Sequence, residues 1–221
     1  MPKLIWDEVG KRFYETGLDH GVLYVYDASK KTYKSGVPWN GLTAVSETPS
    51  GGESNPQYAD NIKYIELFSE EEFGASIEAF TYPVEFEACD GTRDIIPGVT
   101  ATQQRRTMFA MSYRTIIGND TSGNDHGYKL HIVYGAHAKP SERQRNTIND
   151  SPELTTFSWE LTTSKVPVTT VAGLRATAHV VIDSTKTDAG VMKKIEEALY
   201  GSEAKTANLL LPDDIFKLTG V

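Results

Sequence analysis

Apolar side chains recur at every second residue in several separated stretches of this chain. A period of two is typical of β-strands that bury one face and leave the other to solvent. The pattern is clearest over 153–163, where Phe157, Trp159 and Leu161 share one side. Further strands are predicted over 21–26, 62–68, 73–82, 107–115, 126–134 and 175–182, all rich in the β-branched and aromatic residues that suit a pleated surface.

The alternation also predicts which side chains face the core. In two of these strands the apolar set lies on one face and polar side chains such as Lys129 and His131 point away from it. The predicted core-facing sets are Tyr128, Leu130, Ile132 and Tyr134 in one strand, and Phe109, Met111 and Tyr113 in the other.

Helical patterns are scarce. The best helix is predicted over 188–200, where an apolar residue recurs at spacing four, Thr187 or Asp188 can cap the start and Gly201 can end it. A short helical turn is expected at 84–88, after Pro83. The sequence therefore predicts one mainly β domain over 1–221, a β-sandwich or barrel-like fold with one or two flanking short helices.

Two long polar connections interrupt the strands, at 46–60 and 138–152. The first contains two prolines and a Gly-Gly pair, so we expect a flexible excursion. Connections of this length inside a compact domain are usually functional or disordered.

Composition limits the classes of function. The formal charge is −8, which disfavours tight nucleic-acid binding because that affinity comes mostly from Lys and Arg. The single cysteine, Cys89, cannot form a bridge within the chain. There is no run of about 18 apolar residues and the first residues lack a secretory signal pattern, so a soluble protein that is not exported is expected.

Signatures of catalysis and cofactor binding are missing: the sequence has no phosphate-binding loop, nucleophile elbow or zinc-protease motif. Asp125, His126, His131 and His137 are the strongest metal candidates, but His126 and His131 would point to opposite faces of a strand, which favours ordinary strand histidines. Cys89 lies beside Asp90, which would raise the pKa of its thiol. No catalytic residue, cofactor or metal site is therefore predicted.

For three groups of polar residues we prefer a structural role to a functional site. Glu70, Glu71 and Glu72 read as a solvated turn, and the oxygen-rich segment 119–125 reads as a hairpin loop, since it lacks the full calcium-loop pattern. The basic residues are too dispersed for a nucleic-acid groove and are expected in intersubunit salt bridges: Arg105, Arg106, Lys139, Arg143 and Arg145.

Several sequence segments, taken in order, resemble the major tail proteins, or tail tube proteins, of long-tailed bacteriophages, with the non-contractile siphovirus type preferred. The resemblance covers most of the chain, from about Leu4 to Tyr200. The segments are GVPWNGLT (36–43), YADNIKY (58–64), EFGASIEAFTYP (72–83), FEACDG (86–91), YRTIIGND (113–120), GYKLHIVYGA (127–136), NDSP (149–152) and FSWE (157–160).

This resemblance implies a structural virion protein without enzymatic activity. Subunits of that family form rings, usually hexameric, that stack into a hollow tube through which genomic DNA is delivered. It implies ring-to-ring contacts by an N-terminal arm (1–12), the long loop (46–60) and a C-terminal arm (202–221). The candidate self-assembly residues are Trp39, Asn40, Thr48, Pro49, Gly51, Gly52, Glu53, Pro56 and Tyr58; no bore-facing residue is assigned.

The implied partners follow from the same resemblance. The chain is expected to bind copies of itself, a tape-measure protein, a tail terminator and baseplate or distal tail proteins. DNA would pass through the lumen without specific binding, and no membrane is involved. The expected location is the virion tail, after assembly in the host bacterial cytoplasm.

Two alternatives stay open. A monomeric β-sandwich module could bind carbohydrate by stacking exposed aromatic residues such as Trp39 and Tyr58 on sugar rings. A β-sandwich hydrolase would use Asp60, Glu78 or His131, and is the least favoured.

Overall fold

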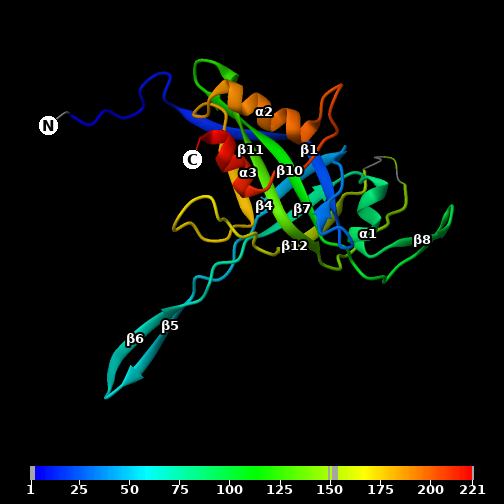
Figure 1. Ribbon diagram of the computed structural model, residues 1–221, viewed down its shortest axis with the longest axis horizontal. Coiled ribbons are helices and arrows are strands. Elements are labelled where there is room, and N and C mark those ends of the chain that lie inside the picture. The colour runs from blue at the N-terminus through cyan, green and yellow to red at the C-terminus, as the bar shows by residue number, and fades with distance from the viewer. Residues whose placement is uncertain (1–2, 149, 151–153, 221) are drawn as a thin grey trace.

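The computed structural model describes residues 3–148, 150 and 154–220, and within them one large antiparallel sheet dominates (Figure 1). The prediction of a mainly β fold is confirmed. The strands of this sheet are β1 (Phe13–Asp27), β2 (Thr32–Tyr33), β3 (Val37–Pro38), β4 (Leu42–Glu47), β7 (Gly74–Ala79), β10 (Phe109–Asn119), β11 (Gly123–Ala138), β12 (Phe157–Thr163) and β13 (His179–Asp183).

Strand order places the longest strands side by side. The path runs β2-β1-β10-β11-β12-β7-β4, with β3 added on β1 and β13 on β11. Neighbouring strands are antiparallel, from the long β1–β10 pair to β4–β7 at the other end. Two further pairs lie outside this sheet: β5 (Ser54–Ala59) with β6 (Ile62–Phe68), and β8 (Arg93–Ile96) with β9 (Val99–Ala101).

The sheet wraps around an aromatic core. Trp159 of β12 is fully buried, as predicted from the alternation, and its ring packs edge-on against Phe86, with 5.1 Å between ring centroids. Trp39 packs against the same Phe86 ring at 4.6 Å. Because residues of β1, β7, β10, β11 and β12 all contribute, the sheet must curl to enclose this cluster: Leu23, Val25, Trp39, Ala75, Ile77, Ala79, Phe86, Cys89, Phe109, Met111, Tyr113, Val133, Ala136, Ala138, Trp159 and Leu161.

Helices cover the outer face of the central strands. Their elements are α2 (Ala189–Tyr200) and α3 (Pro212–Thr219), while a 3₁₀ turn η1 (Val84–Phe86) and the short α1 (Glu87–Asp90) lie elsewhere, after Pro83. The predicted cap is confirmed, since the Asp188 side chain accepts hydrogen bonds from the backbone N–H groups of Gly190 and Val191. Helix α2 packs its buried stripe on the sheet: Met192, Ile195 and Leu199 against Tyr24, Leu130, Ile132 and Tyr134.

The segment 202–220 does not extend away from the body. Leu209 and Leu210 lead into α3, whose Ile215 is buried with α2 against the sheet. The Tyr134 hydroxyl donates to the Leu210 carbonyl at 2.9 Å and fixes this connection. The C-terminal arm predicted at 202–221 is therefore folded onto its own subunit as far as residue 220, because α3 buries an apolar face there.

The central strands are buried on both faces, which corrects one prediction. Side chains of β11 that face the helices include Leu130 and Ile132, whereas Val133 faces the enclosed core. His131 was expected to point to solvent, but its side chain is buried, because the opposite face of this strand lines the inside of the curled sheet. A strand covered on both sides buries its polar residues as well as its apolar ones, so alternation alone does not show which residues meet solvent.

Strand β11 changes its partner near Gly135. Residues 129–133 pair with β13 and residues 136–138 pair with β12. Gly135 has φ +59°, and a Cβ added there would lie 2.3 Å from the Ser164 carbonyl oxygen. Only glycine fits this conformation and this approach, so Gly135 makes the bend that lets one strand serve two neighbours.

The buried carboxylate of Asp90 pairs with basic residues of the same chain. Asp90 accepts from Trp159 Nε1 at 3.0 Å and is paired with Arg143, while Arg106 Nη1 lies 3.6 Å from the same carboxylate. Lys139 pairs with Glu160. Arg106, Arg143 and Lys139, which we expected in intersubunit salt bridges, therefore have carboxylate partners within their own chain.

Candidate assembly surface

A long β-hairpin projects from the body of the subunit (Figure 1). Its strands β5 and β6 pair only with each other in the described part of the chain, from Ser54↔Phe68 to Ala59↔Ile62. Asp60 and Asn61 form the tip, both with positive φ (51° and 66°). Positive φ at both turn residues is the type I′ pattern of two-residue hairpins, and Asp and Asn tolerate it better than other non-glycine residues.

The root of the hairpin continues the sheet. The Thr48 amide donates to the Gly74 carbonyl at 2.8 Å, and Ser50 and Glu72 exchange two backbone hydrogen bonds at 2.9 and 2.8 Å. The chain thus passes from β4 into β5 and returns from β6 into β7 as one extended ribbon. The segment 46–60, expected to be a flexible excursion, is instead ordered on both sides of its glycines, because the strand at 62–68 pairs with it.

Every residue of β6 is exposed, although five of its seven side chains are large and apolar or aromatic. Tyr64 is 75% exposed. Successive side chains of a strand point to opposite faces. The exposed apolar residues of the hairpin therefore fall on both faces: Ile65 and Leu67 lie on one face and Phe68 on the other, while Tyr58, Ile62 and Tyr64 lie at or beyond the β-bulge next to Tyr58.

An isolated two-stranded hairpin is marginally stable in water, and exposed apolar patches of this kind mark interaction sites. The body of the subunit covers neither face of this hairpin. The arrangement therefore fits a segment that becomes buried between other protein surfaces.

The predicted self-assembly residues separate into two groups. Trp39 is 3% exposed, and its Nε1 donates to the Thr81 carbonyl at 3.0 Å, so it is a core residue and leaves the candidate surface. Asn40 is exposed in the turn before β4. The others lie on the ribbon: Thr48, Pro49, Gly51, Gly52 and Glu53 in its stalk, and Pro56 and Tyr58 in β5.

Sequence reasoning missed the apolar residues of β6 as contact residues. It treated 62–68 as an ordinary half-buried strand, since these residues have high β-propensity. The usable signal was that apolar residues occupy both parities of the strand, which a surface strand with one buried face does not require.

Two other segments expose apolar side chains. Residues 3–12 precede β1 without regular structure and carry Leu4, Ile5, Trp6 and Val9 in exposed positions. The Gly10 amide donates to the Asp120 carboxylate at 2.9 Å, which fastens this segment to the β10–β11 turn. The β8–β9 ribbon exposes Ile95, Ile96 and Val99. Residues 1 and 2 of the predicted arm lie outside the described residues, as do 149, 151–153 and 221 in other predicted segments.

The loop at 119–125 has a structural role. Asn119 Oδ1 accepts from the Ser122 amide at 2.6 Å and the Thr121 amide at 3.2 Å, which closes the turn between β10 and β11. The hairpin interpretation of this oxygen-rich segment is confirmed.

Residues considered for hydrolysis do not converge. Asp60 lies at the tip of the projecting hairpin, Glu78 lies in β7, and His131 lies inside the curled sheet. Glu70 pairs with Lys165 at 2.8 Å. No two of these groups share a site in which acid–base catalysis requires them close together.

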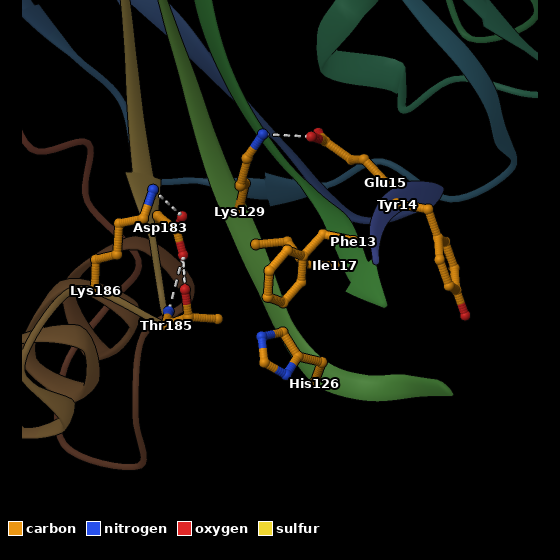
Figure 2. Close-up of a pocket in the computed structure, with 9 residues that line it drawn as sticks. All are labelled: Phe13, Tyr14, Glu15, Ile117, His126, Lys129, Asp183, Thr185 and Lys186. Atoms are coloured by element: carbon orange, nitrogen blue, oxygen red, sulfur yellow. Dashed lines mark hydrogen bonds and ion pairs between the residues drawn. The ribbon is translucent and has the colours of Figure 1, made fainter. Parts of the chain in front are cut away.

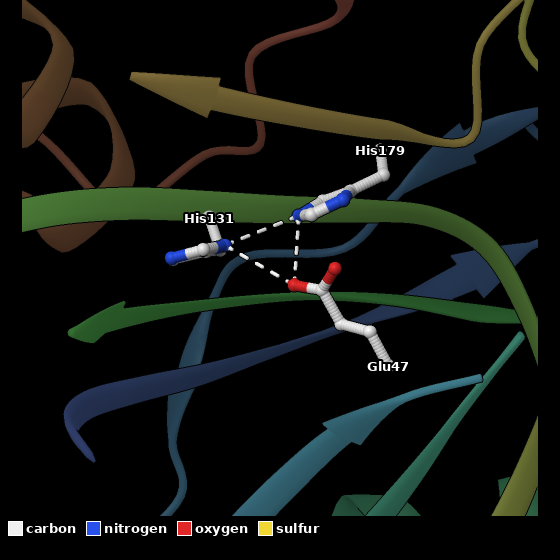
Figure 3. Close-up of side chains that lie close together, drawn as sticks. All are labelled: Glu47, His131 and His179. Carbon is white, nitrogen blue, oxygen red and sulfur yellow. Dashed lines mark hydrogen bonds and ion pairs between the residues drawn. The ribbon is translucent and has the colours of Figure 1, made fainter. Parts of the chain in front are cut away.

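The predicted histidine set is also dispersed. His126 packs its ring against Phe13, with 5.1 Å between centroids. His131 instead lies beside His179 of β13 and Glu47 at the end of β4, and the ligand atoms of these three side chains are within 4.8 Å of one another (Figure 3). The sequence offers no spacing signal for this cluster, since its members are far apart in the chain.

One surface depression has a volume of about 460 Å³ and lies beside Phe13, Tyr14 and Ile117, with His126 at its wall (Figure 2). Its charged groups are paired with each other: Lys129 with Glu15, and Lys186 Nζ with Asp183 at 3.3 Å. Since Trp39 is buried, the aromatic platform expected for carbohydrate binding is not assembled at that residue.

The thiol of Cys89 is buried, and this burial, with Asp90 beside it, raises its pKa to about 12. A thiol of that pKa is neutral and unreactive at pH 7. The predicted direction holds, with burial as the larger cause. No helix in the described part of the chain is long and apolar enough to span a membrane.

Comparisons with known proteins give little beyond this geometry. No family model and no curated protein matches the sequence. Among solved structures, the chain is similar to one from the sheath–tube complex of an extracellular contractile injection system (PVC) in the extended state. That match has 12% identity and a TM-score of 0.30, and covers 80% of this chain and 93% of the other. At this TM-score we draw nothing about function from the similarity.

Proposed function

We propose that this chain is the tail tube subunit of a long-tailed bacteriophage of the siphovirus type. Copies associate into rings, hexameric as is usual in the family it resembles, and the rings stack into the hollow tube through which the genome is delivered. The single observation that carries the proposal is the projecting β5–β6 hairpin with exposed apolar side chains on both faces. The partner that covers these exposed faces is a second copy of this chain.

The exposed surface of the hairpin supports self-association. A hairpin apolar on both faces needs two covering surfaces, which adjacent subunits of a ring and of the next ring provide together. The sheet has edge strands such as β4, and a closed ring removes the unpaired edges that a monomer would expose. The segment 3–12 adds exposed apolar residues and serves as a second contact between rings.

The charge of −8 suits a tube that conducts DNA. Binding to DNA depends on Lys and Arg contacts with phosphates, and an acidic lumen avoids such contacts. In this proposal the tape-measure protein occupies the lumen during assembly, and a terminator and distal tail proteins close the two ends. The subunit is then a virion component, assembled in the host cytoplasm, without catalysis or cofactor chemistry of its own.

Electron microscopy of the purified full chain tests the proposal. We expect rings or hollow tubes of uniform width in negative stain, with sizing chromatography showing growth with concentration. Tyr64→Glu should abolish the tubes and leave a folded monomer, because a charge would be buried in the contact. Leu174→Glu, a matched exposed apolar position in the loop before β13, should assemble normally.

Two results would contradict the proposal. One is a wild-type chain that stays monomeric at every concentration, and the other is tubes that form equally well with Tyr64→Glu. A wild-type chain that stays monomeric would favour the monomeric carbohydrate-binding module, and a glycan-binding screen would then be the next experiment.

A further inference from the structure

The strands β4, β11 and β13 bring three metal-ligating side chains to one point inside the mouth of the curled sheet. His131 of β11 lies opposite Val181 of β13, and His179 lies opposite Val133. The two histidines are therefore two residues out of register on the same face, within diagonal reach of each other. Glu47 is the last residue of β4 and turns its carboxylate toward both rings (Figure 3).

The distances between the ligand atoms define the site. His131 Nδ1 lies 3.3 Å from His179 Nε2, Glu47 Oε1 lies 3.6 Å from His131 Nδ1, and the same oxygen lies 3.9 Å from His179 Nε2. A circle through three points with these separations has a radius of about 2.1 Å, which equals the Zn–N and Zn–O bond lengths found in proteins. We propose that Glu47, His131 and His179 bind one zinc ion.

Hydrogen bonding alone explains the cluster less well. Both separations between the carboxylate and the rings exceed 3.5 Å, so neither is a hydrogen bond. The three ligand atoms nevertheless lie within 4.8 Å of one another. Zinc would satisfy all of them at once, whereas a proton between the two imidazoles would satisfy two.

Hydrogen bonding to Thr115 orients the His131 ring as a ligand. Its Nε2 lies 3.1 Å from Thr115 Oγ1, and that hydroxyl donates to the Glu15 carboxylate at 2.6 Å. Since the Thr115 proton is used for Glu15, the Thr115 oxygen accepts from Nε2–H of His131. The proton of this imidazole is thereby placed on Nε2, and Nδ1 keeps its lone pair. Outer-shell partners of this type orient most metal-binding histidines.

Other neighbours hold the remaining ligands. The Tyr113 hydroxyl donates to Glu47 Oε1 at 3.2 Å, and the Tyr113 ring stacks on His131 with 4.7 Å between centroids. The Phe73 ring packs against His179 at 4.5 Å.

Access to the site is from the carboxylate side. The side chains of His131 and His179 are 7% and 13% exposed, whereas that of Glu47 is 42% exposed. A tetrahedral site with these bond lengths has ligand atoms about 3.4 Å apart, so the exposed Glu47 carboxylate would move a few tenths of an ångström toward the two rings, and a water molecule would fill the fourth position on this open side. The ion would fasten the end of β4, where the chain leaves for the projecting hairpin, to two strands of the body.

Metal titration of the purified full chain tests this inference. We expect one zinc ion per chain by competition with a chromophoric chelator, and a tetrahedral d–d absorption band when cobalt(II) is used as the probe. His179→Gln should lower zinc affinity by more than the roughly 10- to 100-fold that loss of an outer-shell partner costs. Thr115→Val should lower it within that range. His20→Asn, at an exposed histidine outside the cluster, should bind as wild type.

Glu47→Gln is the second ligand variant, because it keeps the side-chain shape at a half-exposed position. If circular dichroism shows that His179→Gln does not fold, the zinc affinity of Glu47→Gln tests the site instead. The inference is overturned if the wild type takes up no zinc, if the folded ligand variants bind zinc as tightly as the wild type, or if the cobalt spectrum is octahedral. Tube formation is scored separately by microscopy, so failure of the zinc site and failure of the assembly proposal give different results.

Discussion

Side chains alternate between two faces both in the body of the subunit and in its projecting hairpin, but the outcome differs: the body buries its apolar side chains and the hairpin exposes them. In β12 the alternation turns Trp159 and Leu161 into a core that the chain itself closes. In β6 it turns apolar residues to two faces that the chain leaves uncovered. Local pattern therefore fixes the strand, but the location of the covering surface decides whether that strand stabilises the monomer or the assembly.

The largest expected effect is on the body. Trp159→Ala should lower the free energy of unfolding by about 3 to 5 kcal/mol, because it empties a fully buried aromatic site. Urea denaturation followed by fluorescence of the remaining tryptophans measures this loss. A loss under about 1 kcal/mol would mean that the aromatic cluster is not the core of the subunit.

A second change tests how tightly the body is built around the partner switch of β11. Gly135→Ala should cost about 2 to 3 kcal/mol, since it adds backbone strain and a 2.3 Å approach to the Ser164 carbonyl oxygen. Gly52→Ala is the matched control on the hairpin stalk: its φ is +69° but nothing lies within 4 Å of an added Cβ. It should cost only the strain, about 1 kcal/mol. Equal losses for the two variants would contradict this interpretation of Gly135.

The pH dependence of the free energy of unfolding tests the body of the subunit at His179. Burial lowers the pKa of His179 to about 4, with Glu47 and His131 facing it. A histidine with a depressed folded pKa leaves stability unchanged above its unfolded pKa, near 6.5, and lowers stability as pH falls from there toward 4, because the unfolded chain then binds more protons. In metal-free buffer the folded subunit should lose about 1 to 2 kcal/mol between pH 7 and pH 5.

His179→Gln should flatten that part of the profile, and His20→Asn should leave it unchanged. A wild-type profile that is flat from pH 7 to pH 5, or a slope that His179→Gln does not reduce, would mean that His179 is protonated as easily in the folded chain as in the unfolded one. A part of the slope remains in this variant, because burial also lowers the pKa of His131.

The smallest effect on stability is expected in the hairpin. Tyr64→Ala should change the free energy of unfolding by no more than about 0.5 kcal/mol, because the side chain contacts solvent in the monomer. The same variant should raise the concentration needed for assembly, as sizing chromatography would show. A large loss of monomer stability would break the contrast between the two regions.

Much of the body was predictable from sequence. The alternation located β10, β11, β12 and β13, with ends that differ by up to four residues. It ended β10 and β11 four residues early, began β11 three residues late, and began β12 and β13 four residues early. The cap at Asp188 and the apolar spacing located α2. These elements are set by local patterns that also serve the global fold, which is why sequence reasoning found them.

The remainder depends on contacts between distant segments. His131 was placed on the correct face by alternation, but whether that face meets solvent depends on the curl of the whole sheet. Glu47 and His179 approach it only after three strands are in position. Strand β5 contains Ser54, Asn55 and Pro56, which have low β-propensity, and it forms because β6 pairs with it.

The root of the hairpin has a mechanical consequence. The ribbon joins β4 on one side and β7 on the other, and β7 pairs in turn with β12 from Phe157↔Ala79 to Thr162↔Gly74. Hydrogen bonds of antiparallel strands run perpendicular to the strand axis. A pull along the hairpin would therefore load the whole β7–β12 ladder in shear, with its bonds resisting together. A projecting arm anchored in this way can carry tension into the body without peeling the sheet one bond at a time.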